Sequence, residues 1–148
     1  MRFGMWSLAA IMLALSWSAN AAELSPLGRW WLFDDETGAR SGIIEITLSH
    51  DELVGRIVKL IPKPGDPPEF VCDRCDGPEK NQRVLGMIIL KGLKRDGDMW
   101  DGGNILDPRT GNVYSCELRV DGSGKELYLR GYLGISLLGR TQTWVREE

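Results

Sequence analysis

The sequence contains two cysteines at a spacing that supports several kinds of chemistry, Cys72-x-x-Cys75. Such a pair can act as a redox couple, form a structural disulfide or supply half of a zinc site. Redox pairs usually open a helix, whose positive end lowers the thiol pKa. Here prolines precede the pair, and Asp73 and Asp76 accompany it, which favours the protonated thiol. The sequence therefore predicts a disulfide that braces a loop, in preference to a catalytic redox site.

The third cysteine, Cys116, leaves two alternatives open. It shares an alternating apolar face with Leu118, where a lone cysteine usually packs as a small hydrophobe. It could instead pair with Cys72 or Cys75 if the segment that carries them folds back over the domain. A zinc site would need a fourth ligand, and the single histidine, His50, is predicted at a distant turn. We treat all three cysteines as disulfide candidates and predict neither a metal nor a cofactor.

Two groups of acidic residues could bind cations. Asp96, Asp98 and Asp101 resemble the start of a calcium loop, but Trp100 occupies the position of the third acid and no glutamate closes the loop. Residues 34–36 (Asp-Asp-Glu) suit a turn, in which such side chains bond to nearby backbone groups. Both groups are interpreted as solvated turns. No hydrolase elbow, phosphate loop or zinc-protease motif is present in the sequence, so we assign no catalytic residue.

Short apolar runs separated by Gly, Asp, Asn and Pro must position these residues, and no convincing amphipathic helix interrupts the runs. Residues 34–38, 96–98, 107–111 and 121–124 suit tight hairpin turns. Successive hairpins make antiparallel neighbours, and eight such strands can close into an up-and-down barrel without exposed edges. The predicted strands are residues 29–34, 42–49, 53–61, 84–91, 99–106, 112–120, 126–132 and 138–146.

Residues 62–83 are predicted to form a long loop. They hold five of the seven prolines, and a proline cannot donate a hydrogen bond into a strand ladder. A loop of this length in a compact domain is usually functional or braced. Cys72 and Cys75 are the expected brace.

Arg130 and Tyr132 share one face of the predicted strand 126–132, opposite Leu127 and Leu129. If the leucines point into the barrel, Arg130 and Tyr132 are surface groups, which is the reading that we favour. If the strand faces the other way, the two side chains line the interior and could hold an anionic head group. They are therefore the candidate ligand-binding residues.

The first and last strands carry a pattern of their own. Gly28-x-Trp30 opens the first strand, and Arg140, Gln142 and Trp144 project from one face of the last. These strands are neighbours in a closed barrel, which could place the guanidinium of Arg140 on the indole of Trp30. The pattern resembles the hallmark of lipocalin-like (calycin) barrels. That resemblance implies that Gly28, Trp30, Arg140 and Trp144 close one end of the barrel and have a structural role.

Four stretches match a known family more closely. They are Gly28-Arg29-Trp30 with Asp35 and Thr37-Gly38, residues 72–77 (CDRCDG), residues 100–108 (WDGGNILDP) and residues 130–144 (RGYLGISLLGRTQTW). With them, residues 27–146 resemble the bacterial exported family of unknown function DUF2147. The resemblance implies a lipocalin-like barrel in the bacterial envelope and supplies no established activity.

Residues 1–21 are predicted to be a cleavable secretory signal peptide, with Arg2, an uncharged apolar run over 3–17 and small residues at 19 and 21. That run is shorter than the roughly 20 residues that cross a bilayer. Residues 22–148 then form one domain with 17 basic and 21 acidic residues and a net charge near −4. This balance argues against nucleic acid as a partner. We expect a periplasmic or secreted protein without a membrane span in its mature form.

Together these observations predict an all-β fold, a single eight-stranded antiparallel up-and-down barrel of lipocalin-like architecture. Such barrels can enclose one small ligand, so the expected function is binding of a small hydrophobic or amphipathic molecule in the envelope. The alternative is an interaction or structural module with a packed barrel, which uses the long loop and the 134–139 turn as contacts. An enzyme is the third hypothesis, for which the sequence identifies no convergent polar groups.

Overall fold

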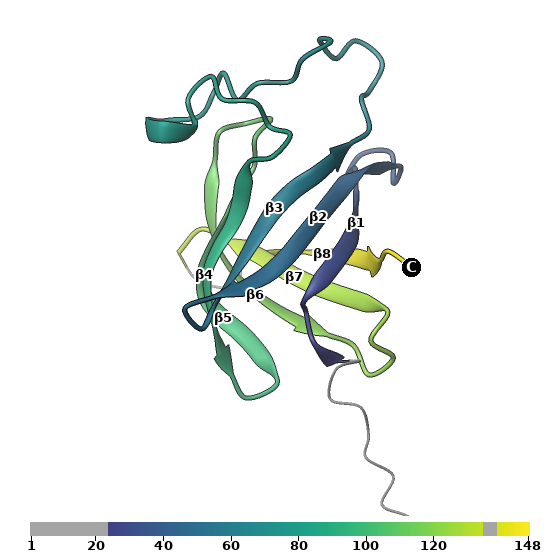
Figure 1. Ribbon diagram of the computed structural model, residues 1–148, viewed down its shortest axis with the longest axis vertical. Helices are drawn as coiled ribbons and strands as arrows, with labels where there is room; N and C mark the ends of the chain where they lie inside the picture. The colour runs from purple at the N-terminus through teal and green to yellow at the C-terminus, as the bar shows by residue number, and fades with distance from the viewer. Residues whose placement is uncertain (1–23, 135–138) are drawn as a thin grey trace, which may run out of the picture.

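The computed structural model describes residues 24–134 and 139–148, which form a closed barrel of eight antiparallel strands (Figure 1). Each strand pairs with its neighbours in sequence, and the last pairs with the first. The predicted up-and-down barrel is thus confirmed, whereas the predicted signal peptide lies outside the described residues. The strands are β1 (Gly28–Phe33), β2 (Arg40–Ser49), β3 (Glu52–Leu60), β4 (Ile88–Asp96), β5 (Met99–Leu106), β6 (Val113–Val120), β7 (Glu126–Tyr132) and β8 (Arg140–Arg146).

The fourth strand, β4, was predicted over residues 84–91 and is observed at Ile88–Asp96, so it begins four residues later and ends five residues later than predicted. Residues 84–87 form a turn, in which the N–H of Met87 donates to the carbonyl of Val84 (3.0 Å). Gly86, within this turn, has a left-handed φ of 90°. The side chain of Val84 is buried all the same. The apolar pattern here therefore reflects packing of a loop on the barrel and not a strand.

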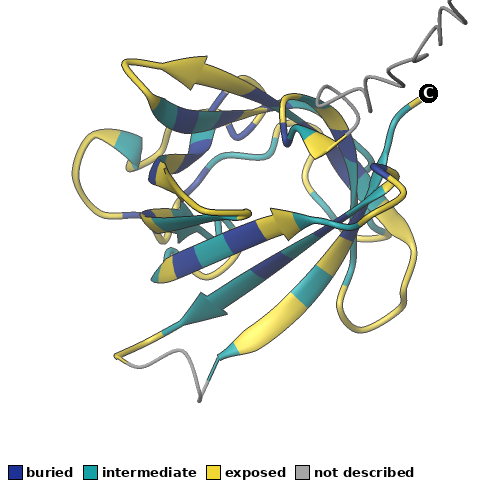
Figure 2. Ribbon diagram, turned by 90° about the horizontal axis from the view of Figure 1, so that it is seen from below, coloured by how far each residue is buried: buried dark blue, intermediate teal, exposed yellow. Residues whose placement is uncertain are grey.

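The core lies inside the barrel because alternate residues of each strand point inward, and the buried residues form bands along the strands in Figure 2. Burial of one large apolar side chain stabilises a fold by about 1.5–3 kcal/mol, so this cluster is the main source of stability. Its members include Trp30, Ile44, Ile46, Leu53, Ile57, Leu90, Leu93, Cys116, Leu118, Leu127, Leu129 and Trp144, with Cys72, Cys75, Val84 and Met87 from outside the strands.

Arg146, the last residue of β8, closes one end of the barrel. Its guanidinium carbon lies 4.1 Å from the centroid of the Trp30 ring. The same guanidinium donates to the carbonyl oxygens of Ser25 (2.7 Å), Leu27 (3.0 Å) and Gly124 (2.7 Å). One side chain thus joins the chain before β1, the turn before β7 and the buried indole.

Arg140 was the arginine expected on Trp30, and the structure corrects this expectation. Since β1 and β8 are antiparallel, Trp30 pairs with Arg146, and Arg140 lies six residues away, about 20 Å along an extended strand. Arg140, Gln142 and Trp144 do share the inward face of β8, since all three line the interior. Side-chain alternation identifies this face but not which end of it meets β1.

Gly28 and Trp30 both belong to the closed end. Gly28 has a φ of 115°, and a Cβ there would lie 3.2 Å from Nη1 of Arg146. A side chain at this position would therefore be strained and would crowd the guanidinium. Trp30 is fully buried, and its indole N–H donates to the carbonyl of Pro26 (2.8 Å). The buried polar atom of the indole is thus satisfied.

Residues 61–87, named here the 61–87 loop, connect β3 and β4 at the opposite end of the barrel (Figure 1). The loop contains the short 3-10 turn η2 (Gly77–Glu79) and the disulfide Cys72–Cys75, which confirms the predicted brace. Backbone hydrogen bonds fold the loop on itself, from Cys72 to Gln82 (2.9 Å) and from Asn81 to Cys72 (2.8 Å). Over the described part of the chain, no helix is long and apolar enough to cross a membrane.

The 61–87 loop packs on the turn between β5 and β6. The Sγ of Cys72 lies 3.3 Å from the carbonyl oxygen of Pro108. Gly111 lies against the carbonyl of Arg74, so closely that a Cβ there would be 2.0 Å from this oxygen. The disulfide region therefore rests directly on the β5–β6 turn, and this contact fixes the loop beside the barrel entrance.

Candidate functional site

A cavity of about 620 Å³ opens at the end of the barrel opposite Arg146. The inner faces of the strands form its wall, and the 61–87 loop and the β1–β2 and β5–β6 turns form its entrance. Its apolar lining is Leu32, Phe33, Ile57, Leu60, Phe70, Val84, Ile89, Ile105, Leu106, Pro108, Leu129, Gly131 and Trp144. Its polar lining is Asp34, Asp35, Glu36, Ser41, Lys63, Asp107, Arg109, Thr110, Tyr114, Arg140 and Gln142.

The inner end of the cavity is apolar. Ile57, Leu129 and Trp144 line it and are at most 2% exposed. Gly131 follows Leu129 on the same face of β7, and a Cβ there would make only an ordinary contact with Tyr114, at 3.6 Å. The absence of a side chain at Gly131 therefore leaves space that a larger residue would fill.

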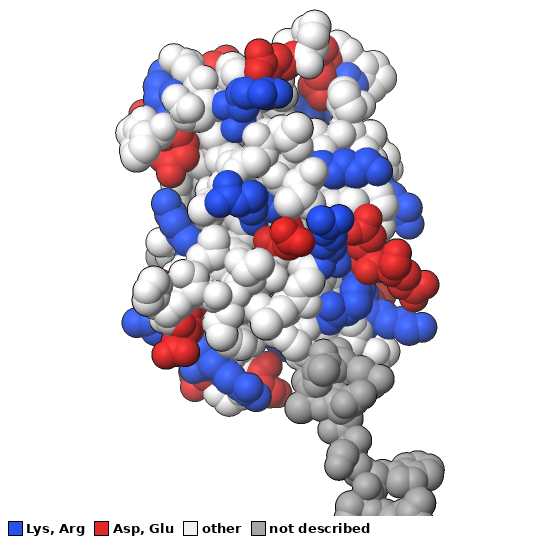
Figure 3. All heavy atoms as spheres, in the orientation of Figure 1, with Lys and Arg blue, Asp and Glu red and all other residues white. Residues whose placement is uncertain are grey.

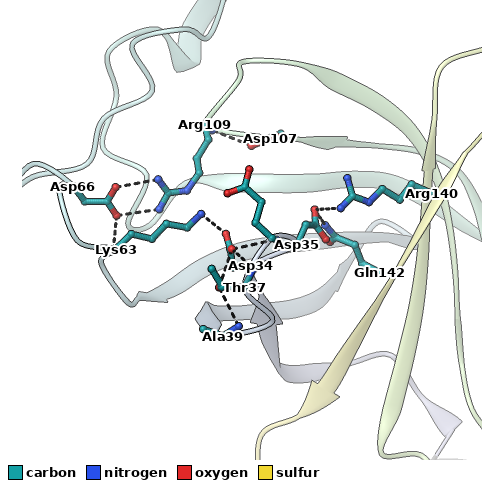
Figure 4. Close-up of polar contacts among 11 residues, drawn as sticks. Asp34, Asp35, Thr37, Ala39, Lys63, Asp66, Asp107, Arg109, Arg140 and Gln142 are labelled. Atoms are coloured by element: carbon teal, nitrogen blue, oxygen red, sulfur yellow. Dashed lines mark hydrogen bonds and ion pairs between the residues drawn. The ribbon is translucent and has the colours of Figure 1, made fainter.

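Two ion pairs tie the 61–87 loop to the entrance (Figure 4). Nη1 and Nη2 of Arg109 each donate to one carboxylate oxygen of Asp66, at 3.0 Å. The Arg109 hydrogen bonds, helped by the backbone N–H of Lys63, lower the pKa of Asp66 to about 2. Lys63 in turn pairs with Asp34 of the β1–β2 turn, and this hydrogen bond lowers the pKa of Asp34. Both carboxylates are therefore ionised at neutral pH, and the loop is connected to both neighbouring turns.

A second set of polar contacts runs along the wall from the entrance toward the inner end (Figure 4). Nη2 of Arg140 lies 3.2 Å from Oδ2 of Asp35. Nε2 of Gln142 donates to the same oxygen (3.0 Å), and Oε1 of Gln142 accepts the indole N–H of Trp144 (3.2 Å). The polar atom of Trp144 is thus satisfied within the wall, and its ring remains as apolar surface.

The acidic residues after β1 have a role that the sequence analysis missed. Asp34 does cap the β1–β2 turn as predicted, because its carboxylate accepts the backbone N–H of Thr37 (3.0 Å). The same turn also places Asp34, Asp35 and Glu36 at the cavity entrance. The available signal was that the end of the first strand and the start of the last must meet in a closed barrel, which brings Asp35 to Arg140.

The structure places Arg130 and Tyr132 on the outer face of β7. Leu127 and Leu129, which alternate with them, are buried inside the barrel. Nη1 of Arg130 donates to the hydroxyl of Thr141 on β8 (3.1 Å). Neither candidate residue is among the described residues that line the cavity. The leucines of β7 therefore point into the barrel, as we favoured, and Arg130 and Tyr132 are surface groups.

Cys116 is a free, fully buried thiol, so its alternative pairing with Cys72 or Cys75 is not observed. Burial, with a smaller effect of the Asp101 charge, raises its pKa to about 12. Within residues 24–134 and 139–148, no group of three His, Cys, Asp or Glu side chains is arranged to hold a metal ion. Cys116 therefore acts as a small apolar side chain of the core.

The thiol of Cys116 is expected to resist Ellman's reagent in the folded protein at pH 8 and to react once urea unfolds the chain. Relative to a free cysteine with a pKa of about 8.5, its thiolate fraction is lower by roughly a thousandfold. Absorbance at 412 nm should report one thiol per chain after unfolding without reductant and three after reduction. Three thiols without reductant would contradict the Cys72–Cys75 disulfide.

The sequence matches a protein family over the whole barrel. Residues 28–146 match the family described as "Uncharacterized protein conserved in bacteria (DUF2147)". The chain belongs to the DUF2147 family. The matched region begins at the first residue of β1 and ends at the last residue of β8, so the DUF2147 domain includes both the closed end and the cavity.

A solved structure has the same fold as this DUF2147 domain. The structure described as "Protein HP1028 from the human pathogen Helicobacter pylori belongs to the lipocalin family" is similar with a TM-score of 0.72 and 16% sequence identity over 84% of each chain. At this identity the likeness shows the fold alone, which is lipocalin-like. No match was found among proteins of curated function.

Proposed function

We propose that the mature protein is an exported protein of the bacterial envelope that binds one small, partly apolar molecule in its barrel. The observation that supports this function is the cavity of about 620 Å³, apolar at its inner end and charged at its entrance. Ligand sites are typically about 300–1,000 Å³ in volume and combine an apolar lining with a few placed polar groups. Export is supported by the signal-peptide pattern of residues 1–21.

The size of the cavity bounds the ligand. At roughly 30 Å³ for each water-sized group, the cavity holds about 20 non-hydrogen atoms. A barrel that served only as a packed interaction module would be more stable with this space filled. Gly131 offers room for a side chain that would fill part of it. The open space therefore supports the ligand-binding function over the packed-module alternative.

Replacement of Gly131 by leucine is expected to weaken binding of a neutral apolar probe at least tenfold, because the new side chain occupies the cavity. N-phenyl-1-naphthylamine is a suitable probe, since its fluorescence rises in apolar surroundings. Gly131 has no left-handed φ and only ordinary contacts around its Cβ position, so the barrel should tolerate the substitution. Fluorescence titration measures the dissociation constant and the stoichiometry, which should be one probe per chain.

Ser115→Leu is the matched control, because Ser115 is an exposed residue of β6, the strand next to Gly131, and alternates with the buried Cys116. This control should bind the probe as the unmodified protein does. Absence of probe binding by the unmodified protein would contradict the proposed function. An equal loss of probe affinity in Gly131→Leu and Ser115→Leu would mean that the probe binds outside the cavity, and this too would contradict the proposed function.

A further inference from the structure

The charges around the cavity entrance form neutral pairs with two carboxylates in excess. Among the residues that the structure describes, three basic side chains line the cavity, and each one forms an ion pair with an aspartate. The pairs are Lys63 with Asp34, Arg109 with Asp66, and Arg140 with Asp35. The basic residues therefore contribute no net positive charge to the entrance.

Glu36 and Asp107 are the two further carboxylates that line the cavity. The ion pairs within 4.0 Å among the described residues include neither of them. Asp107 accepts the backbone N–H of Arg109 (2.9 Å). The side chain of Arg109 already forms two hydrogen bonds to Asp66. Asp66 raises the pKa of Arg109, and the charges of Asp34 and Asp107 add smaller effects in the same direction. One guanidinium therefore interacts with several carboxylates, and the entrance has more negative than positive charges.

This excess is a property of the entrance and does not come from a charged surface as a whole. On the face shown in Figure 3, basic and acidic side chains are interspersed. The full chain has a net charge of only −3. The sequence of residues 135–138, Ile-Ser-Leu-Leu, carries no charge, so these residues do not change the balance at the entrance.

We propose, building on the proposed function, that the cavity prefers an amphipathic ligand with a cationic head group, of the class of long-chain aliphatic amines. The tail would pack on Leu129 and Trp144, and the ammonium group would lie at the entrance near Glu36 and Asp107. Arg140 is the most exposed of the three basic side chains in the wall, at 69%, so it is the first partner that a carboxylate head group would meet. An anion there would also meet the carboxylate of Asp35, 3.2 Å from the same guanidinium, and the like charges would repel.

Three ligands with one chain length and different head groups test this preference. Decylammonium, decanol and decanoate would each displace N-phenyl-1-naphthylamine from the protein at pH 7, below their micelle concentrations. We expect decylammonium to displace the probe at a concentration at least tenfold lower than decanoate does, with decanol between them. The ratio of the displacing concentrations of decanoate and decylammonium should fall toward one in 0.5 M NaCl, because salt screens charges at an open entrance.

The double variant Glu36→Gln/Asp107→Asn should reduce the preference for decylammonium over decanol by about fifteenfold, since two unit charges about 5 Å away in a water-like dielectric each contribute roughly fourfold. Its thermal unfolding midpoint shows whether the fold is retained. Glu117→Gln is the matched control, because Glu117 alternates with the buried Cys116 and Leu118 and faces away from the cavity. This variant should leave the preference unchanged.

The outcomes separate this proposal from the function on which it rests. Equal displacement by the three ligands, or stronger displacement by decanoate, would overturn the cationic preference and leave apolar ligand binding in place. A preference that survives the double variant would also overturn it, because Glu36 and Asp107 would not be its source. Failure of the probe itself to bind would overturn both.

Discussion

Replacement of Arg146 by alanine is expected to lower the free energy of unfolding by about 3 kcal/mol. The substitution removes three hydrogen bonds from a charged donor to backbone carbonyls and the stacking on Trp30. Hydrogen bonds to charged groups contribute about 1.5–3 kcal/mol each, and the total is reduced here because water can reach part of the site. Urea denaturation followed by tryptophan fluorescence measures the change.

Arg140→Ala provides the matched control for this experiment, since it removes the same side chain from the same face of the same strand. Arg140 is largely exposed and forms an ion pair with Asp35. Exposed ion pairs contribute about 0–1 kcal/mol, so the loss should be below about 1 kcal/mol. An equal or larger loss for Arg140→Ala would mean that the closed end of the barrel is not held by Arg146.

The second large effect is expected for Gly111→Ala, which should detach the 61–87 loop from the β5–β6 turn. Gly111 has a φ of 76°, and a Cβ would lie 2.0 Å from the carbonyl oxygen of Arg74. Backbone on both sides of this contact must move, since neither group is a flexible side chain. Limited trypsin digestion should cut within the loop, after Lys80 or Arg83, at least tenfold faster than in the unmodified protein. Mass spectrometry of the fragments identifies the cleavage sites.

Gly97→Ala separates steric overlap from backbone strain. Gly97 has a similar φ of 65° in the β4–β5 turn, but no atom lies within 4 Å of its Cβ position. Alanine should therefore cost only the left-handed conformation, about 1–2 kcal/mol. Trypsin should cut the loop of this variant no faster than that of the unmodified protein. Similar loop cleavage in the two variants would show that Gly111 does not anchor the loop.

The barrel was predictable because its determinants are local. Turns such as residues 121–124 join consecutive strands, and side-chain alternation assigns residues such as Leu127 and Leu129 to the interior. The observed strands other than β4 begin and end within two residues of the predicted ones. The start of β4 differs because a buried valine in a packed loop, Val84, has the same apolar signal as a strand residue. Burial and strand conformation cannot be separated by hydrophobicity at such positions.

The cavity was less predictable because it depends on distances between segments that are remote in sequence. Asp66 and Arg109 are 43 residues apart and meet only because the loop is docked on a turn. Gln142 and Asp35 are 107 residues apart and meet because the barrel closes. Residue types alone indicated turn chemistry for Asp34 and a loop for the segment that contains Lys63. The volume left by Gly131 is likewise set by its neighbours and not by the glycine itself.

The pairing of β1 with β8 also has a kinetic consequence. Every other ladder joins strands that are adjacent in sequence, whereas this one joins the two ends of the domain through Trp30 with Arg146 and Trp31 with Val145. Contacts between remote segments carry the largest loop-closure cost, so this seam should form after the hairpins have assembled. Interactions made after the rate-limiting step change the unfolding rate more than the folding rate. We therefore expect substitutions in this seam, at the end of the barrel farthest from the cavity, to shorten the lifetime of the folded protein chiefly by raising its unfolding rate.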